Sequence, residues 1–114
     1  TPAAKAMLKH LSVARASFET VVDYVVANFK SDIKGVFAGS VAYLRLCGLV
    51  LGAWQMARGL LAAQRLRDTD PSFYDVKITT ARFFAENLLP QAQALAVSIV
   101  ESGQSTNALA VEQF

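Results

Sequence analysis

Apolar residues recur along the chain at helical spacing, and no segment keeps the period of two that indicates a half-buried strand. In the segment from Pro2 to Phe29, the apolar residues that form one seam are separated by alternating steps of four and three: Met7, Leu11, Ala14, Phe18, Val21 and Val25. Charged side chains fall off this seam. The pattern predicts a first helix that buries the seam against other helices at a shallow crossing angle.

The second predicted helix has two possible starts. Asp32 is a suitable N-cap and could open it, or Ser40 could open it after a looser connection that contains glycines. From either start the helix continues to about Arg67. From Val41 to Trp54 it is apolar on nearly every face, which indicates burial on several sides.

The length of this apolar stretch bears on whether it could cross a membrane. A transmembrane helix needs about 20 apolar residues, whereas Val41 to Trp54 is shorter and is interrupted by Arg45. We therefore expect a core helix and no membrane span. A bundle buries only part of a helix's circumference, so the surplus apolar side is expected to form an interface, with Leu49 and Val50 as candidates for its outward residues.

The third predicted helix begins at Pro71 with Asp70 as its cap. Its apolar face is expected to comprise Tyr74, Ile78, Ala81, Ala85, Leu88, Ala92, Leu95 and Ile99. Pro90 interrupts this pattern, so a bend is expected there. Gly103 is expected to end the helix as a C-terminal cap. The tail 104–114 is expected either to hold a short turn of helix or to be partly disordered.

Three long helices with short links predict an all-α fold, an antiparallel up-down-up bundle with a possible short fourth helix at the C-terminus. The chain has 114 residues and no visible internal boundary, so residues 1–114 are expected to form one helical domain. Hydrophobic residues make up 54% and charged residues 18%, against about a quarter charged in ordinary soluble domains. The composition indicates either a large core or a surface that meets a partner.

Charge and cysteine content narrow the possible functions. The net charge of +2 is carried by scattered residues, which argues against a nucleic-acid-binding surface. Cys47 is the single cysteine, so an internal disulfide is excluded and a reducing compartment is favoured. With no signal peptide recognised at the polar N-terminus, we expect a cytoplasmic location.

Candidate chemistry is sparse. His10, the one histidine, could be a phosphoacceptor or a general base, but its sequence neighbours offer no paired carboxylate or second nitrogen ligand, so a surface histidine is favoured. Asp68, Asp70 and Asp75 lack the glycine turn and the closing glutamate of a calcium loop. We therefore predict no catalytic, cofactor-binding or metal-ligating residue in this chain.

The apolar middle of the second helix contains several residues that need an explanation. Arg45 requires a partner there, and a structural pairing is favoured over ligand binding. Cys47 is expected to be a buried, inert thiol. Glycines occur in pairs four residues apart, Gly35 with Gly39 and Gly48 with Gly52. Such glycines either permit the close approach of another backbone or are simply tolerated, and both alternatives remain open.

A family resemblance rests on two stretches and the end of the chain. They are Tyr43 to Val50 followed by Trp54, then Lys77 to Gln91, and the closing Glu112-Gln113-Phe114. Together they resemble the C-terminal helical accessory domain of bacterial acyl-CoA dehydrogenases of the methylmercaptopropionyl-CoA dehydrogenase-like group. Nearly the whole chain is covered, although Cys47 stands where the family more often has phenylalanine.

The resemblance implies a parent enzyme of fatty acid metabolism that uses FAD to oxidise acyl-CoA to enoyl-CoA. In that family the flavin, the acyl pocket and the catalytic glutamate belong to the preceding core, so Glu86 inherits no role as a base. A non-catalytic accessory or interface domain is implied, with the catalytic core as its partner and a homo-oligomer expected. The alternatives are a free-standing helical adaptor or dimerisation protein, and a phosphotransfer bundle that uses His10.

Overall fold

The computed structural model describes residues 1–114, and every regular element in it is helical. The α-helices are α1 (Pro2–Asn28), α2 (Ile33–Ala38), α3 (Ser40–Leu66), α4 (Pro71–Phe83), α5 (Gln91–Glu101) and α6 (Gly103–Thr106). A π-helical turn, η2 (Phe84–Leu88), joins α4 to α5, and the 3₁₀ turns are η1 (Arg67–Thr69) and η3 (Val111–Gln113). The predicted all-α class is confirmed.

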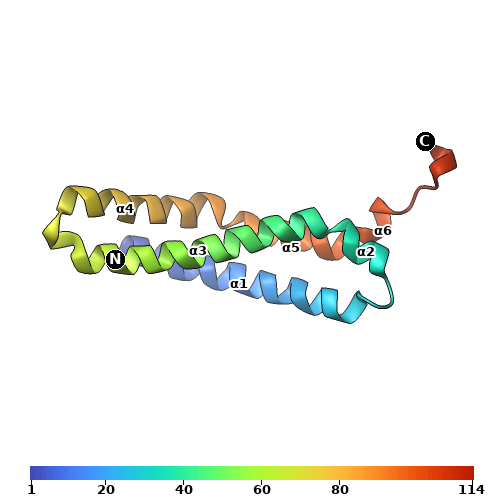
Figure 1. Cartoon of the computed structure of the whole chain (residues 1–114), viewed down its shortest axis with the longest axis horizontal. Coiled ribbons are helices and arrows are strands. Elements are labelled where there is room, and N and C mark those ends of the chain that lie inside the picture. Colours follow the sequence, from blue (N-terminus) through green and yellow to red (C-terminus); the bar gives the residue numbers. More distant parts are fainter.

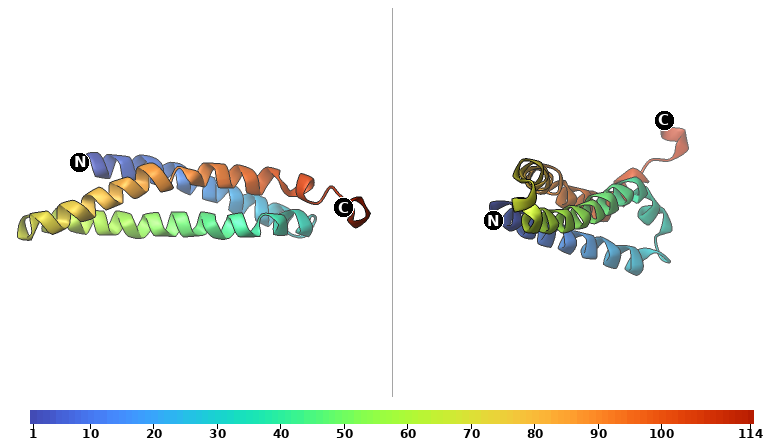
Figure 2. Two further views of the ribbon diagram at one scale, coloured as in Figure 1. Left: turned by 90° about the horizontal axis from the view of Figure 1, so that it is seen from above. Right: turned by 60° about the vertical axis from the view of Figure 1, so that its left-hand side comes forward.

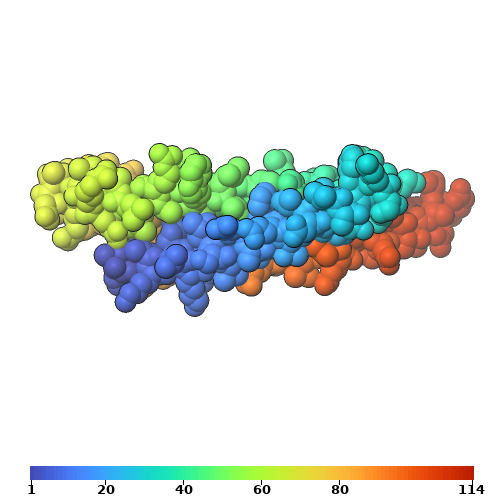
Figure 3. All heavy atoms as spheres, turned by 90° about the horizontal axis from the view of Figure 1, so that it is seen from below, coloured from blue at the N-terminus to red at the C-terminus, as the bar shows by residue number.

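The long helices lie side by side along one axis (Figure 1). α1 and α3 contact each other, and α4 and α5 follow one another along both of them (Figure 2). The Cα extents are 64 × 28 × 16 Å, and the radius of gyration is 18.1 Å, against about 13 Å for a compact domain of this length. A helix with its side chains is about 10 Å across, so the smallest extent of 16 Å leaves room for little more than two layers of helices. The domain is therefore a long, thin slab (Figure 3).

Capping residues fix where the helices begin. The Asp32 side chain accepts a hydrogen bond from the Gly35 N–H at 3.1 Å and caps α2, while α3 begins separately at Ser40. Both possible starts of the second predicted helix are therefore used, one for each helix. The Asp70 side chain accepts from the Phe73 N–H at 3.3 Å and caps α4, as predicted.

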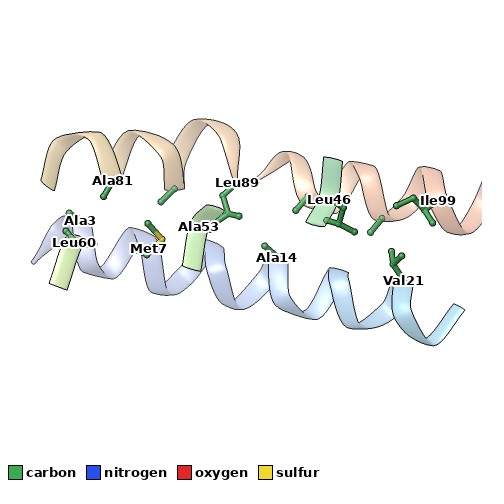
Figure 4. Packing of buried hydrophobic residues seen from close by; sticks show 13 residues of the cluster. Ala3, Met7, Ala14, Val21, Leu46, Ala53, Leu60, Ala81, Leu89 and Ile99 are labelled. Carbon is green, nitrogen blue, oxygen red and sulfur yellow. The ribbon is translucent and has the colours of Figure 1, made fainter. Parts of the chain in front are cut away.

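The core runs as a narrow line along the slab (Figure 4). Only 17 of 114 residues are buried, and many of these are alanines, which let the helix backbones approach closely. The largest fully buried side chains are Leu46, Leu89, Ile99 and Val21. In the predicted seam of α1, Met7, Ala14 and Val21 are buried and the other three residues pack against the core, which confirms the seam.

The third predicted helix is divided, and this corrects one core residue. In the π-helical turn the Leu89 N–H donates to the carbonyl of Phe84 at 3.0 Å, five residues back, just before Pro90. The wider turn brings Leu89 round to the core and swings Leu88 outward. Leu89 is 0% exposed and Leu88 is 38% exposed, so the prediction of Leu88 as a core residue was wrong.

Gly103 does not end a helix as predicted. Ser102 follows the last residue of α5, Gly103 opens α6, and no glycine has a positive φ. A Cβ atom on Gly103 would lie 3.0 Å from the Cα of Gly35. The absence of a side chain therefore lets α6 approach α2, and a similar approach to Ile99 explains Gly39, whose Cβ would lie 3.1 Å from the Cγ2 of Ile99.

The C-terminal tail leaves the body of the slab beyond α6 (Figure 1). It contains one short 3₁₀ turn, in which the Ala110 N–H donates to the Gln113 side chain at 2.8 Å. Val111 and Phe114 are 83% and 92% exposed. A short turn of helix, one of the two alternatives expected, is present, and Val111 and Phe114 are left largely uncovered by their own chain.

Candidate interaction surface

α3 has an inner face and an outer face. Its inner face buries Leu46, Ala53 and Leu60. We define the α3 outer face as the positions opposite these, spaced alternately by three and four residues: Val41, Leu44, Gly48, Leu51, Gln55, Arg58, Ala62 and Arg65. Val41, Leu44 and Leu51 are 82%, 74% and 60% exposed. The N-terminal half of this face is therefore an uncovered apolar stripe.

The outward residues are not the two that the sequence suggested. Leu49 and Val50 are both half-buried, and Val50 packs against the core. They lie three and four residues after Leu46, so they flank the buried side of the helix. Leu44 and Leu51 point outward instead.

The C-terminal half of the α3 outer face is basic and carries an open surface depression. A shallow depression of about 580 Å³ is lined by Gln55, Arg58, Gly59, Leu61, Ala62 and Arg65. Nothing lies within 4 Å of where a Cβ of Gly59 or Gly48 would be, so no contact within the chain explains either glycine. The Arg58 guanidinium lies 5.4 Å from the centre of the Trp54 ring, which orients it beside the depression.

The same helix is long and apolar enough to cross a membrane. Ser40–Thr69 has an 18-residue window of mean hydropathy 1.4, of which 22% is buried. The expectation of no span considered only the shorter stretch from Val41 to Trp54. In the structure α3 packs along α1, α4 and α5, and part of its apolar surplus, Val41, Leu44 and Leu51, is exposed on the α3 outer face.

The singled-out polar residues take structural positions. Arg45 donates to the side-chain oxygen of Gln91 at 2.7 Å and so links α3 to α5, which confirms a structural pairing, although the partner is an amide. Cys47 is half-buried, so the expectation of a buried thiol was too strong. Burial, followed by the nearby Cys47, raises the pKa of the Tyr43 hydroxyl above its usual value of 10.0. His10 is half-buried on α1 and forms no ion pair.

The acidic residues do not converge on a site. No group of three or more His, Cys, Asp or Glu side chains is placed to hold a metal ion. Asp70 is used as a cap, and Asp75 forms a two-point ion pair with Arg67, whose Nε lies 2.6 Å from Oδ1. The hydrogen bond from Arg67 holds the pKa of Asp75 below its usual 3.8 and raises the pKa of Arg67.

This ion pair predicts a small pH dependence of stability. Because the pKa of Asp75 is lower in the folded chain, the pair stabilises the fold above the unfolded pKa of about 3.9, and the contribution disappears as the pH falls through the lowered value. We expect Asp75→Asn to lower the free energy of unfolding slightly at pH 7, since the pair is exposed. Urea unfolding over a series of acidic pH values should show the difference between the two proteins shrinking as the pH falls below the unfolded pKa. A difference that stays constant over that series would contradict the assignment.

These features define a class: a thin, all-helical domain whose distinctive feature is an uncovered apolar face rather than a polar pocket. The chain belongs to the family described as "Acetyl-CoA dehydrogenase C-terminal like", which matches residues 1–110. It is 33% identical over 105 residues to a protein of Ruegeria pomeroyi named 3-methylmercaptopropionyl-CoA dehydrogenase. That match covers 90% of this chain and only 18% of the relative. No solved structure matches the chain.

Proposed function

We propose that this domain is the non-catalytic C-terminal accessory domain of an FAD-dependent acyl-CoA dehydrogenase. The observation that carries the proposal is the family match over residues 1–110, in a chain that spans about a fifth of its relative. The uncovered α3 outer face supports it, because an apolar stripe of this kind usually marks an interface. The domain's role is then to pack on the catalytic core or across a subunit interface.

The proposal extends to the whole enzyme. The parent binds FAD, oxidises an acyl-CoA to an enoyl-CoA within fatty acid metabolism, is located in the cytoplasm and forms a homo-oligomer. The acyl pocket, the flavin and the catalytic base belong to the preceding core. We also propose that α1, α3 and the α4–α5 segment act as the three arms of an up-down-up bundle, with the π-helical turn as a bend within the third arm.

Flavin content tests this division of roles. We expect the full-length polypeptide to purify with FAD and to oxidise an acyl-CoA, whereas residues 1–114 alone, incubated with FAD and passed through a desalting column, should emerge without flavin absorbance. A full-length protein without flavin or dehydrogenase activity would contradict the proposed enzyme. A stoichiometric flavin spectrum in the isolated domain would contradict its accessory role.

A free-standing adaptor or dimerisation protein is the second candidate. The exposed Val111 and Phe114 on the projecting tail favour it, because apolar side chains on such an arm suit insertion into another molecule. The reading frame distinguishes the two functions directly. An upstream dehydrogenase core in the same frame supports the accessory domain, and a frame that begins at this helical domain supports the adaptor.

A further inference from the structure

We propose that the α3 outer face is the surface on which the catalytic core of the same polypeptide docks, with carboxylates of the core entering the basic depression between Arg58 and Arg65. This inference rests on the proposed function, since it requires an upstream core. It assigns the contact to one face of one helix, out of the several exposed sides of the slab.

Spacing and shape indicate the form of the contact. Val41, Leu44 and Leu51 lie on one line together with Gly48, which has no neighbour within 4 Å of a would-be Cβ. Such a line accepts a helix or an extended segment laid along it, and a glycine at its middle lets the partner's backbone approach closely. The depression around Gly59 continues the same line and has room for longer polar side chains.

Charge argues against a second copy of this chain as the occupant. α3 contains Arg45, Arg58 and Arg65 and no aspartate or glutamate. Two copies that met in parallel through the whole face would place arginine against arginine, which opposes association. Two copies that met antiparallel would place each basic half against the apolar stripe of the other copy, where the arginines find no carboxylates. A partner that covers both halves of the face therefore needs an apolar stripe followed by carboxylates, and α3 cannot supply that pattern to itself.

The size of the face also favours a tethered partner. A helix of 27 residues is about 40 Å long, and a strip about 10 Å wide along it offers about 400 Å². A contact of about 800 Å² counted on both sides falls within the range of about 600–1,500 Å² for domains of one chain. It falls below the roughly 1,200–2,000 Å² of stable complexes between separate proteins. A covalent link supplies the effective concentration that compensates for the smaller area.

The position of the N-terminus makes this contact reachable. The side-chain amide of Gln64 bonds to the hydroxyl of Thr1, so the chain enters the domain at the end of α3 that carries Arg58 and Arg65. The slab is 28 Å wide in its middle dimension. About eight extended residues span that width, so a short linker brings the preceding core round to the α3 outer face.

Thiol labelling of the full-length enzyme tests the proposal. In a Cys47→Ser background, Leu44→Cys and Leu51→Cys are compared with Val26→Cys, which lies on α1 and replaces a 76% exposed residue. Labelling by a maleimide is followed by mass spectrometry of the peptide that contains each position. We expect positions 44 and 51 to react at least about tenfold more slowly than position 26, because the docked core covers them. Equal rates at the three positions overturn the proposal.

Two further measurements identify what covers the face. Adding Arg58→Glu and Arg65→Glu together should raise labelling at positions 44 and 51 to near the rate at position 26, whereas Arg15→Glu, on the exposed surface of α1, should leave it unchanged. Protection that disappears on dilution indicates a second copy, and protection that appears only with anionic phospholipid vesicles indicates a membrane. Either result overturns docking on the core. Absence of flavin from the full-length protein is a separate readout and refutes the proposed function instead.

Discussion

Leu89→Ala is expected to lower the free energy of unfolding by about 3 kcal/mol, within the range of about 2–5 kcal/mol for truncating a buried leucine. Leu89 is 0% exposed and is one of the largest side chains in a core that is otherwise rich in alanine. Small neighbours cannot rearrange to fill the space that the isobutyl group leaves. Because a domain of this size has a total stability of only about 5–15 kcal/mol, the loss is a large share of it.

The adjacent leucine provides the matched control. Leu88→Ala removes the same atoms from a residue that is 38% exposed, and we expect a loss below about 1 kcal/mol. Urea unfolding followed by far-UV circular dichroism measures both variants. If Leu88→Ala is the more damaging change, the π-helical turn before Pro90 does not set the register of α5, and the core assignment fails.

The second large effect concerns association of the isolated domain. Leu44→Glu together with Leu51→Glu places two carboxylates on the uncovered apolar stripe of α3. The wild-type domain is expected to self-associate only weakly and at high concentration, through the apolar stripe alone, since the stripe is left without its partner and the basic half of the face is not matched by a second copy. The double variant should raise the dissociation constant of that self-association by more than about tenfold, because each buried charge would be desolvated without a partner.

Light scattering over a concentration series measures this change, and the helical circular dichroism signal should be the same in both proteins. Val26→Glu, on α1, is the surface control and should leave association unaltered. Leu46→Glu is the core control and should unfold the domain, since Leu46 is 0% exposed. If the wild-type domain stays monomeric at every concentration and binds no dye for apolar surfaces, the stripe does not mediate association.

Local signals predicted much of this fold. The seam of α1 and the cap Asp70 depend on residues within one or two helical turns, so the sequence alone was sufficient. The cap Asp32 was one of two alternatives, and only the structure shows that α2 and α3 begin separately. Gly103 was misread because its role depends on Gly35, far away in the chain. The choice between Leu88 and Leu89 depends on an extra-wide turn that the apolar pattern does not encode.

The candidate surface was harder to locate than the core. Nearly every residue from Val41 to Trp54 is apolar, so no polar side of the helix stands out in the sequence. The pattern therefore cannot distinguish the buried side of α3 from its outer side. Only the packing of α1, α4 and α5 around the helix makes that distinction. The need for an interface was predicted from composition, while the residues that form it required the three-dimensional arrangement.

The thinness of the slab affects how its unfolding will appear in solution. Residues on a body only 16 Å thick are already partly solvated when folded, so unfolding exposes less new surface than in a rounder domain of equal length. The heat capacity change and the denaturant slope both scale with that newly exposed surface. The melting curve of the isolated domain should therefore be broad and its denaturant slope shallow, even when the native helices are fully formed.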